Sequence, residues 1–205
     1  MKWIPVLAVL AVLLSEGSSR AAEVDQPTDG GGFVEAFIQG STRLRTEADL
    51  SADQKAEALR RFLDQRYDMD NAMSFILGRY WAEASPEQRH RYLVIFEDYL
   101  LARYGAQFDE IAFHLAVVEV ATGVAGKTIV RTVASRDGGL EIRVDWVLVR
   151  RNEQRWLISD VNVGGISLIE LMRQDFAAVL RANRGDIEAL LAAIKRQTEA
   201  LGNAG

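Results

Sequence analysis

The chain has 205 residues, of which 49 % are hydrophobic and 26 % are charged, and its formal net charge is −5. This composition predicts one folded domain with a sizeable core and excludes an intrinsically disordered chain. The acidic balance argues against nucleic acid as a partner, because phosphate binding needs a basic surface. The absence of cysteine excludes disulfides, thiolate metal sites and a cysteine nucleophile.

The first residues, 1–22, are typical of a secretory signal peptide. Lys2 supplies the positive charge, 3–14 is an uncharged apolar run, and small residues near position 21 supply a cleavage site. The run is shorter than the roughly 20 residues that a membrane-spanning helix needs. We therefore expect cleavage and a periplasmic protein, with a flexible glycine-rich leader at 23–32 and a single domain at 33–201.

Four helices are predicted in the first half of the domain. Apolar residues at helical spacing predict the first over 33–46, and a capping box from Ser51 to Gln54 opens the second. The third helix has one apolar side, formed by Met73, Ile76, Leu77, Tyr80 and Trp81.

The clearest helix start in the chain is Ser-Pro-Glu-Gln at 85–88, where serine caps, proline takes the first helical position and glutamine closes the box. This helix should run to about residue 108. Its apolar stripe is rich in aromatic residues: Tyr92, Ile95, Phe96, Tyr99, Leu100, Tyr104 and Phe108. Periodicity favours packing against a sheet, and the alternative is the wall of an apolar pocket.

Beyond residue 109 the pattern becomes rich in Val, Ile and Thr, with glycine turns. It predicts a four-stranded antiparallel meander over 111–122, 127–135, 139–151 and 154–163. In the last strand the two-residue period places Trp156, Ile158 and Asp160 on one face and Leu157, Val161 and Val163 on the other.

Two helices are predicted to close the chain, over 167–184 and 186–201. The glycines at 164 and 165 should end the last strand, and Ser167 and Glu170 have the spacing of a capping box. Helices on either side of a run of strands predict an α+β domain with the helices on one face of the sheet.

Asp145 and Asp160 are the candidates for catalysis. Asp160 could be a general base with a raised pKa, or it could bond backbone N–H groups or pair with Arg143. No second reacting group is placed beside it, so a structural role is favoured. No metal-ligand cluster, phosphate-binding loop or nucleophile motif is present. We predict that the protein is not an enzyme and binds no cofactor or metal, with a ketosteroid-isomerase-like enzyme using either acid as the alternative.

Several motifs in a fixed order resemble the MlaC family, also known as toluene-tolerance or auxiliary transport proteins. They are Leu-Gly-Arg-Tyr-Trp at 77–81, Ser-Pro-Glu-Gln-Arg at 85–89, Tyr-Leu-Leu-Ala-Arg-Tyr at 99–104, Trp-Leu-Ile-Ser-Asp-Val-Asn-Val-Gly-Gly-Ile-Ser-Leu at 156–168, Arg-Gln-Asp-Phe at 173–176 and Gly-Asp-Ile-Glu-Ala-Leu-Leu at 185–191. A single glycine before the aliphatic-Ser pair is more usual in the family than the two glycines found here.

The resemblance implies a periplasmic lipid carrier. Such a protein shuttles a glycerophospholipid between an outer-membrane lipoprotein complex and an inner-membrane ABC transporter complex, and so maintains outer-membrane lipid asymmetry. It also implies an NTF2/cystatin-like cone with an apolar cavity between the curved sheet and the helices, and we expect a monomer. A hopanoid-associated relative is the alternative within the same lipid-binding class.

A lipid carrier needs an apolar lining, because hiding each CH₂ group from water is worth about 0.8 kcal/mol. The bulky apolar residues of the predicted helices and strands are therefore the candidate lipid-binding residues: Leu77, Trp81, Phe96, Tyr99, Leu100, Tyr104, Leu115, Val117, Ile129, Val144, Trp146, Val161, Val163, Met172 and Phe176.

Overall fold

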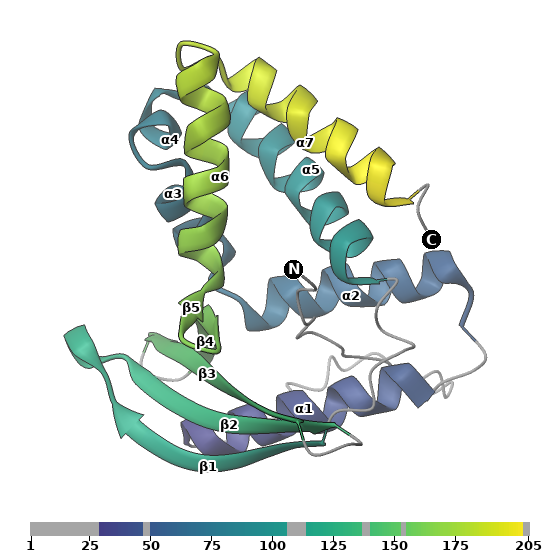
Figure 1. The fold of residues 1–205 in the computed structure, drawn as a ribbon, viewed down its shortest axis with the longest axis vertical. Coiled ribbons are helices and arrows are strands. Elements are labelled where there is room, and N and C mark those ends of the chain that lie inside the picture. The colour runs from purple at the N-terminus through teal and green to yellow at the C-terminus, as the bar shows by residue number, and fades with distance from the viewer. Residues whose placement is uncertain (1–28, 47–49, 106–113, 137–139, 153–154, 203–205) are drawn as a thin grey trace.

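The computed structural model describes residues 29–46, 50–105, 114–136, 140–152 and 155–202 (Figure 1). The expected signal peptide and residues 23–28 of the expected leader lie outside them. Helices α1 to α5 come first: Gly30–Thr46, Ala52–Arg66, Met69–Leu77, Arg79–Glu83 and Pro86–Gly105. The strands β1 to β5 follow: His114–Thr122, Thr128–Arg136, Leu140–Arg151, Arg155–Val163 and Ile166–Ser167, with a short 3₁₀ turn, η2, at Val124–Gly126. Helices α6 (Leu168–Ala182) and α7 (Ile187–Gly202) end the fold.

The first helix begins inside the segment that we expected to be a leader. Asp29 caps it, because its Oδ1 accepts the Gly32 N–H at 2.8 Å. A Cβ atom on Gly30 would lie 3.1 Å from side-chain atoms of Leu148 and Thr128, so the missing side chain lets α1 lie close against the sheet. Residues 30–32 therefore belong to the folded domain. Their glycines predicted flexibility because the sequence does not reveal the surface that they touch.

The predicted helix starts are confirmed at Ser51 and Ser85. The Ser51 Oγ accepts the Gln54 N–H at 3.3 Å, and the Ser85 Oγ accepts the Gln88 N–H at 3.2 Å. The third predicted helix is divided in two at Gly78, where φ is +56°. That left-handed backbone ends α3 and begins α4, which carries the tyrosine and tryptophan that we had placed on one longer helix.

An α+β fold is confirmed, but the sheet formed by the described residues has five strands, not four, in the antiparallel order β1-β2-β3-β4-β5. The fifth strand pairs Ile166 with Val163. Gly164 and Gly165 have φ values of +58° and +85°, which form the two-residue turn between them. The glycine pair had predicted only a strand end, because so short a strand has no periodic pattern to detect.

A β-bulge in β4 corrects the predicted assignment of side chains to faces. Ile158 pairs with Leu148 and Asp160 with Val147, which leaves Ser159 as an extra residue. The extra residue reverses the alternation beyond it. Trp156 and Ile158 therefore share the inner face with Val161 and Val163, whereas Asp160 lies on the opposite face.

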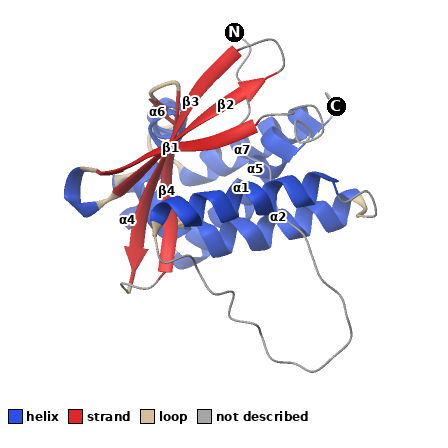
Figure 2. Cartoon of the chain, turned by 90° about the horizontal axis from the view of Figure 1, so that it is seen from below, coloured by secondary structure: helices blue, strands red, loops and turns tan. Residues whose placement is uncertain are grey.

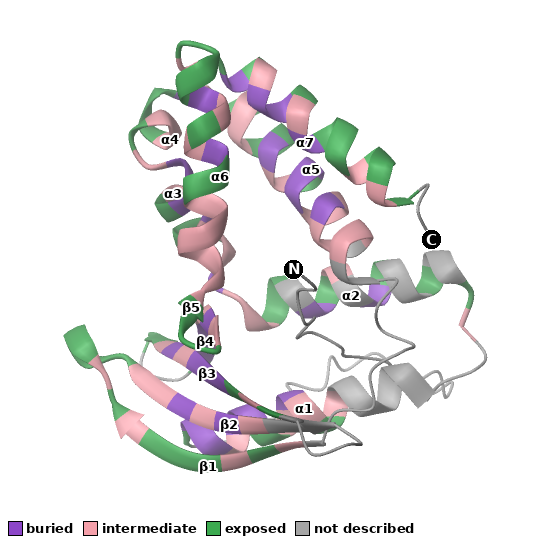
Figure 3. Cartoon of the chain, in the orientation of Figure 1, coloured by how far each residue is buried: buried purple, intermediate pink, exposed green. Residues whose placement is uncertain are grey.

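Two hydrophobic cores hold the domain together. The sheet core lies between the inner face of the sheet and α1 and α2, which run side by side (Figure 2), and its buried members are Phe33, Val34, Phe37, Phe62, Val130, Val144, Trp146, Leu148, Trp156, Ile158 and Val161. The helical core lies among α3 to α7, and its buried members are Met73, Ile76, Leu77, Ala84, Tyr92, Ile95, Phe96, Tyr99, Phe176, Leu180, Ile187, Leu190, Leu191 and Ile194 (Figure 3).

The aromatic stripe of α5 packs mainly against helices. Tyr92, Phe96 and Tyr99 each lie with their ring centroid 6.2 or 6.3 Å from that of Phe176 on α6. The expectation that this stripe covers a sheet is wrong, because its aromatic rings meet Phe176 of α6 and not a strand.

Candidate functional site

The two cores meet at a small apolar crevice beside the base of α6. It lies among α3, α5, α6 and the end of β4, and Leu100 packs against both cores. Its volume is about 60 Å³. The lining is almost entirely apolar and consists of Tyr67, Met69, Ala72, Met73, Ile76, Phe96, Leu100, Ser159, Asp160, Val161, Leu168, Ile169 and Met172.

The predicted lipid-binding residues fall into separate groups. The crevice is lined by Phe96, Leu100, Val161 and Met172. The helical core contains or is flanked by Leu77, Trp81, Tyr99 and Phe176. The sheet core contains or is flanked by Leu115, Val117, Val144, Trp146 and Val163. Ile129 lies beside Gly123 at the turn between β1 and β2, and the side chain of Tyr104 lies outside the described part of the structure.

Trp146 shows why a bulky apolar residue need not face the crevice. It is fully buried in the sheet core, with its ring centroid 4.9 Å from that of Phe37. Its indole N–H donates to the Thr132 Oγ1 at 3.0 Å, and this hydroxyl donates to the Val144 carbonyl. These contacts make it a packing residue of the sheet.

Sequence reasoning missed the methionines as a group. The chain has 4 methionines, and those after Met1 are Met69, Met73 and Met172. All of these later methionines line the crevice, although α3 and α6 are far apart in the sequence. Methionine is unbranched and adaptable, so the site is lined by side chains that can rearrange around a ligand. Met69 and Met73 lie four residues apart on one face of α3, but only the folded chain brings Met172 of α6 to them.

Asp160 has structural partners at the edge of the crevice. Its Oδ1 accepts the N–H groups of Val161 at 2.8 Å and of Ile169, in the first turn of α6, at 3.3 Å. Burial raises the pKa of its carboxyl above the ordinary value, and hydrogen bonds from Ser167 and these two backbone groups oppose that rise. These hydrogen bonds to backbone N–H groups are of the kind expected for the structural role that the sequence favoured.

Asp145 belongs to a row of polar residues on the other face of the sheet. Arg143 donates to both of its carboxylate oxygens, at 3.0 and 2.7 Å, and Arg131 lies 3.9 Å away. In the strand register Glu119 faces Arg131, and Asn162 faces Asp145. Arg143 is therefore the partner of Asp145, and the alternative pairing of Arg143 with Asp160 is not formed.

The arrangement suits binding by burial. The described residues contain no group of three His, Cys, Asp or Glu side chains that could hold a metal ion. None of the described helices is long and apolar enough to cross a membrane. What the crevice offers is a flexible apolar lining with one carboxylate at its edge.

Comparisons with known proteins point to one family. The family model described as MlaC protein matches residues 39–196. A solved structure of a phospholipid-binding protein from Ralstonia solanacearum, in complex with a phospholipid, has a similar fold, with a TM-score of 0.66 and 22 % sequence identity. The match covers 82 % of this chain and 92 % of that chain.

Proposed function

The chain belongs to the MlaC family, and from this premise we propose that it binds a phospholipid and carries it through the periplasm. Its partners would be an inner-membrane ABC transporter complex and an outer-membrane lipoprotein complex, and it would act as a monomer that maintains outer-membrane lipid asymmetry. The related protein from Ralstonia solanacearum, solved with a phospholipid, supports the ligand class. The observation that carries the proposal is the methionine-lined crevice between the two cores.

The size of the crevice requires that it opens to take a lipid. Its volume of about 60 Å³ is far below the roughly 300–1,000 Å³ of typical ligand pockets. Met69, Met73 and Met172 line this narrow space. In the proposal these side chains change rotamer and the helical core moves away from the sheet core at the crevice, so that acyl chains replace the contacts between them.

No covalent step is needed for this function. A carrier holds its ligand by hiding acyl chains from water, and it releases the ligand when a partner or membrane offers an equally apolar environment. Asp160 helps by holding the first turn of α6, which forms one wall of the crevice, and Asp145 helps by tying neighbouring strands.

The experiment is to purify the protein from a bacterial host and identify co-purified lipid by native mass spectrometry and organic extraction. We expect a complex with one phospholipid, and recovery of a hopanoid would instead assign the ligand to the alternative class. Protein that carries no lipid, and binds none when phospholipid is supplied, would contradict the proposal.

A paired substitution tests the position of the site. Ala72→Phe places a ring in the crevice at a half-buried position of α3, and it should reduce lipid content severalfold. Ala178→Phe adds the same ring at an exposed position of α6 and should leave the lipid content unchanged. Equal lipid content in both folded variants would show that the lipid lies elsewhere.

A further inference from the structure

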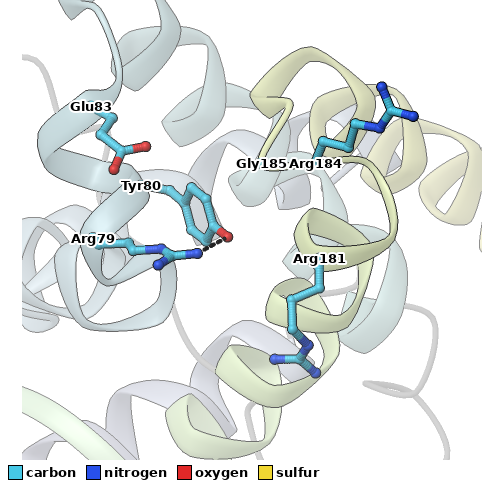
Figure 4. A pocket seen from close by; sticks show the side chains of 6 residues that line it. All are labelled: Arg79, Tyr80, Glu83, Arg181, Arg184 and Gly185. Atoms are coloured by element: carbon cyan, nitrogen blue, oxygen red, sulfur yellow. Dashed lines mark hydrogen bonds between the residues drawn. The ribbon is translucent and has the colours of Figure 1, made fainter.

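A second hollow lies at the far end of α6, between α4 and the turn that joins α6 to α7 (Figure 4). Its volume is about 400 Å³. We call it the arginine pocket, and its lining residues are Arg79, Tyr80, Glu83, Arg181, Arg184 and Gly185. Arg181 is about 14 Å along the helix axis from Met172, given the rise of an α-helix. The arginine pocket is therefore distinct from the crevice.

Arg79, Arg181 and Arg184 line this pocket together with one acidic residue, Glu83. The guanidinium groups of Arg79 and Arg181 lie on its two sides, whereas the side chain of Arg184 extends away from them at the rim (Figure 4). Arg79 is held in place because its Nη2 donates to the Tyr80 hydroxyl at 2.8 Å and its guanidinium lies 4.8 Å from the centre of that ring. Arg181 and Arg184 make no side-chain hydrogen bond or ion pair with any residue that the structure describes. Their charges are thus available to a ligand.

The backbone holds Arg184 in an unusual conformation. Its φ is +56°, a left-handed value that few residues other than glycine adopt. Hydrogen bonds from the Gly185 N–H to the Leu180 carbonyl at 2.7 Å, and from the Asp186 N–H to the Asn183 carbonyl at 3.0 Å, hold the turn. The arginine is therefore fixed at the rim of the pocket at a cost in backbone energy.

Tyr80, on the α4 side of the pocket, packs closely against the turn that contains Arg184 and Gly185. A Cβ atom on Gly185 would lie 2.9 Å from the Tyr80 Cε1, which is too close for any other residue without a shift. Gly185 also has a φ of +85°. Tyr80 can therefore lie against the turn and hold Arg79 on the opposite side of the hollow from Arg181 (Figure 4).

We propose that the arginine pocket binds a phosphate-class oxyanion, either free phosphate or the phosphate of a lipid headgroup. Guanidinium groups match phosphate oxygens with paired hydrogen bonds, and groups approaching from two sides suit a tetrahedral anion better than a planar carboxylate. The volume lies within the range of small-molecule pockets. Because the whole chain is acidic, with a net charge of −5, anion binding would depend on this local cluster. The proposal does not rest on the lipid-carrier function.

The test is a titration of the full-length mature protein with inorganic phosphate, followed by NMR through the backbone amides of Arg184 and Gly185. Vesicles of phosphatidylglycerol, compared with vesicles of phosphatidylcholine, form the second arm. The variant is the pair Arg181→Gln and Arg184→Asn, since asparagine tolerates the left-handed backbone. The control is Arg196→Gln, which removes one exposed charge of α7 outside the pocket.

Saturable phosphate binding that the paired variant weakens at least about tenfold, and the control does not, would support the proposal with free phosphate as ligand. Binding to the anionic vesicles alone, with the same dependence on the variants, would support it with a lipid headgroup as ligand. No saturable binding in either arm, or equal weakening by Arg196→Gln, would overturn it.

Discussion

The Oδ1 of Asp160 accepts the backbone N–H of Ile169 at 3.3 Å and so joins the end of β4 to the first turn of α6. The β-bulge at Ser159 makes this contact possible, because it turns the carboxylate to the face opposite the sheet core. Ile169 lines the crevice. The contact therefore fixes one wall of the candidate site, and the charge of Asp160 should affect the stability of the fold.

The pKa of Asp160 predicts how that effect depends on pH. Burial raises its folded-state pKa above the unfolded value, so the folded state binds the proton more tightly. The stability that this group contributes is therefore greatest at low pH, and it is lost as pH rises from the ordinary carboxyl pKa through the raised one. The Asp160→Asn variant does not lose this stability. The difference in unfolding free energy between the variant and the wild type should therefore shift in favour of the variant as pH rises.

Urea unfolding of both proteins at a series of pH values measures the difference. Asp160→Ala is the companion variant, because it removes the acceptor for α6 and should cost about 1 kcal/mol. A difference between Asp160→Asn and the wild type that stays constant across this pH range would contradict the assignment of a raised pKa.

Replacing Tyr92 with phenylalanine should not lower the free energy of unfolding. It is fully buried in the helical core, and its hydroxyl has no hydrogen-bond partner among the described residues. Burial also raises its pKa well above the ordinary value. Since an unpaired buried hydroxyl is unfavourable by about 1–3 kcal/mol, Tyr92→Phe should leave the unfolding free energy unchanged or higher. Thermal and urea unfolding would reveal a loss of stability, which would mean that the hydroxyl has a partner.

Adding one methyl group at Gly185 should lower the stability of the fold substantially. Gly185→Ala introduces a Cβ 2.9 Å from Tyr80 at a φ of +85°, and should destabilise the protein by more than the roughly 1–2 kcal/mol of the backbone effect alone. Gly164→Ala is the matched control, because its φ is also positive, at +58°, and a Cβ there meets nothing within 4 Å.

A double-mutant cycle separates the clash from the backbone strain. In a Tyr80→Ala background the cost of Gly185→Ala should fall towards that of Gly164→Ala, because the ring that the new methyl meets has gone. An unchanged cost in that background would show that the close contact with the ring contributes nothing.

Features that depend on residues close together in the sequence could be predicted, whereas features that depend on contacts between distant residues could not. The helix starts at Ser51, Ser85 and Ser167 are confirmed, because each serine hydroxyl accepts an N–H from within its own first helical turn. The bulge at Ser159 could not be predicted, because strict alternation is the default in a strand and the extra residue is visible only through the pairing with β3. The strand β5 could not be predicted either, because two residues are too few to show a periodic pattern.

The candidate site was predictable only in part. Hydrophobic periodicity identifies buried residues such as Phe96 and Trp146 but does not say which of them face a crevice. A charged residue at Phe96 or Trp146 would disrupt the helical or the sheet core, where these side chains are 2 % and 0 % exposed, so loss of lipid in such a variant would not locate the site. Half-buried Ala72 is a better position because it lines the crevice without holding a core together.

The most direct test of the account uses the methionines themselves. Labelling with ¹³C-methyl methionine places probes at Met69, Met73 and Met172, all of which line the crevice. Delipidated protein should be titrated with phospholipid while the methyl signals are recorded by NMR. The account predicts that all of these signals shift together and saturate with one lipid per protein. Saturable lipid binding that leaves the methyl signals of all of these methionines unchanged would contradict it.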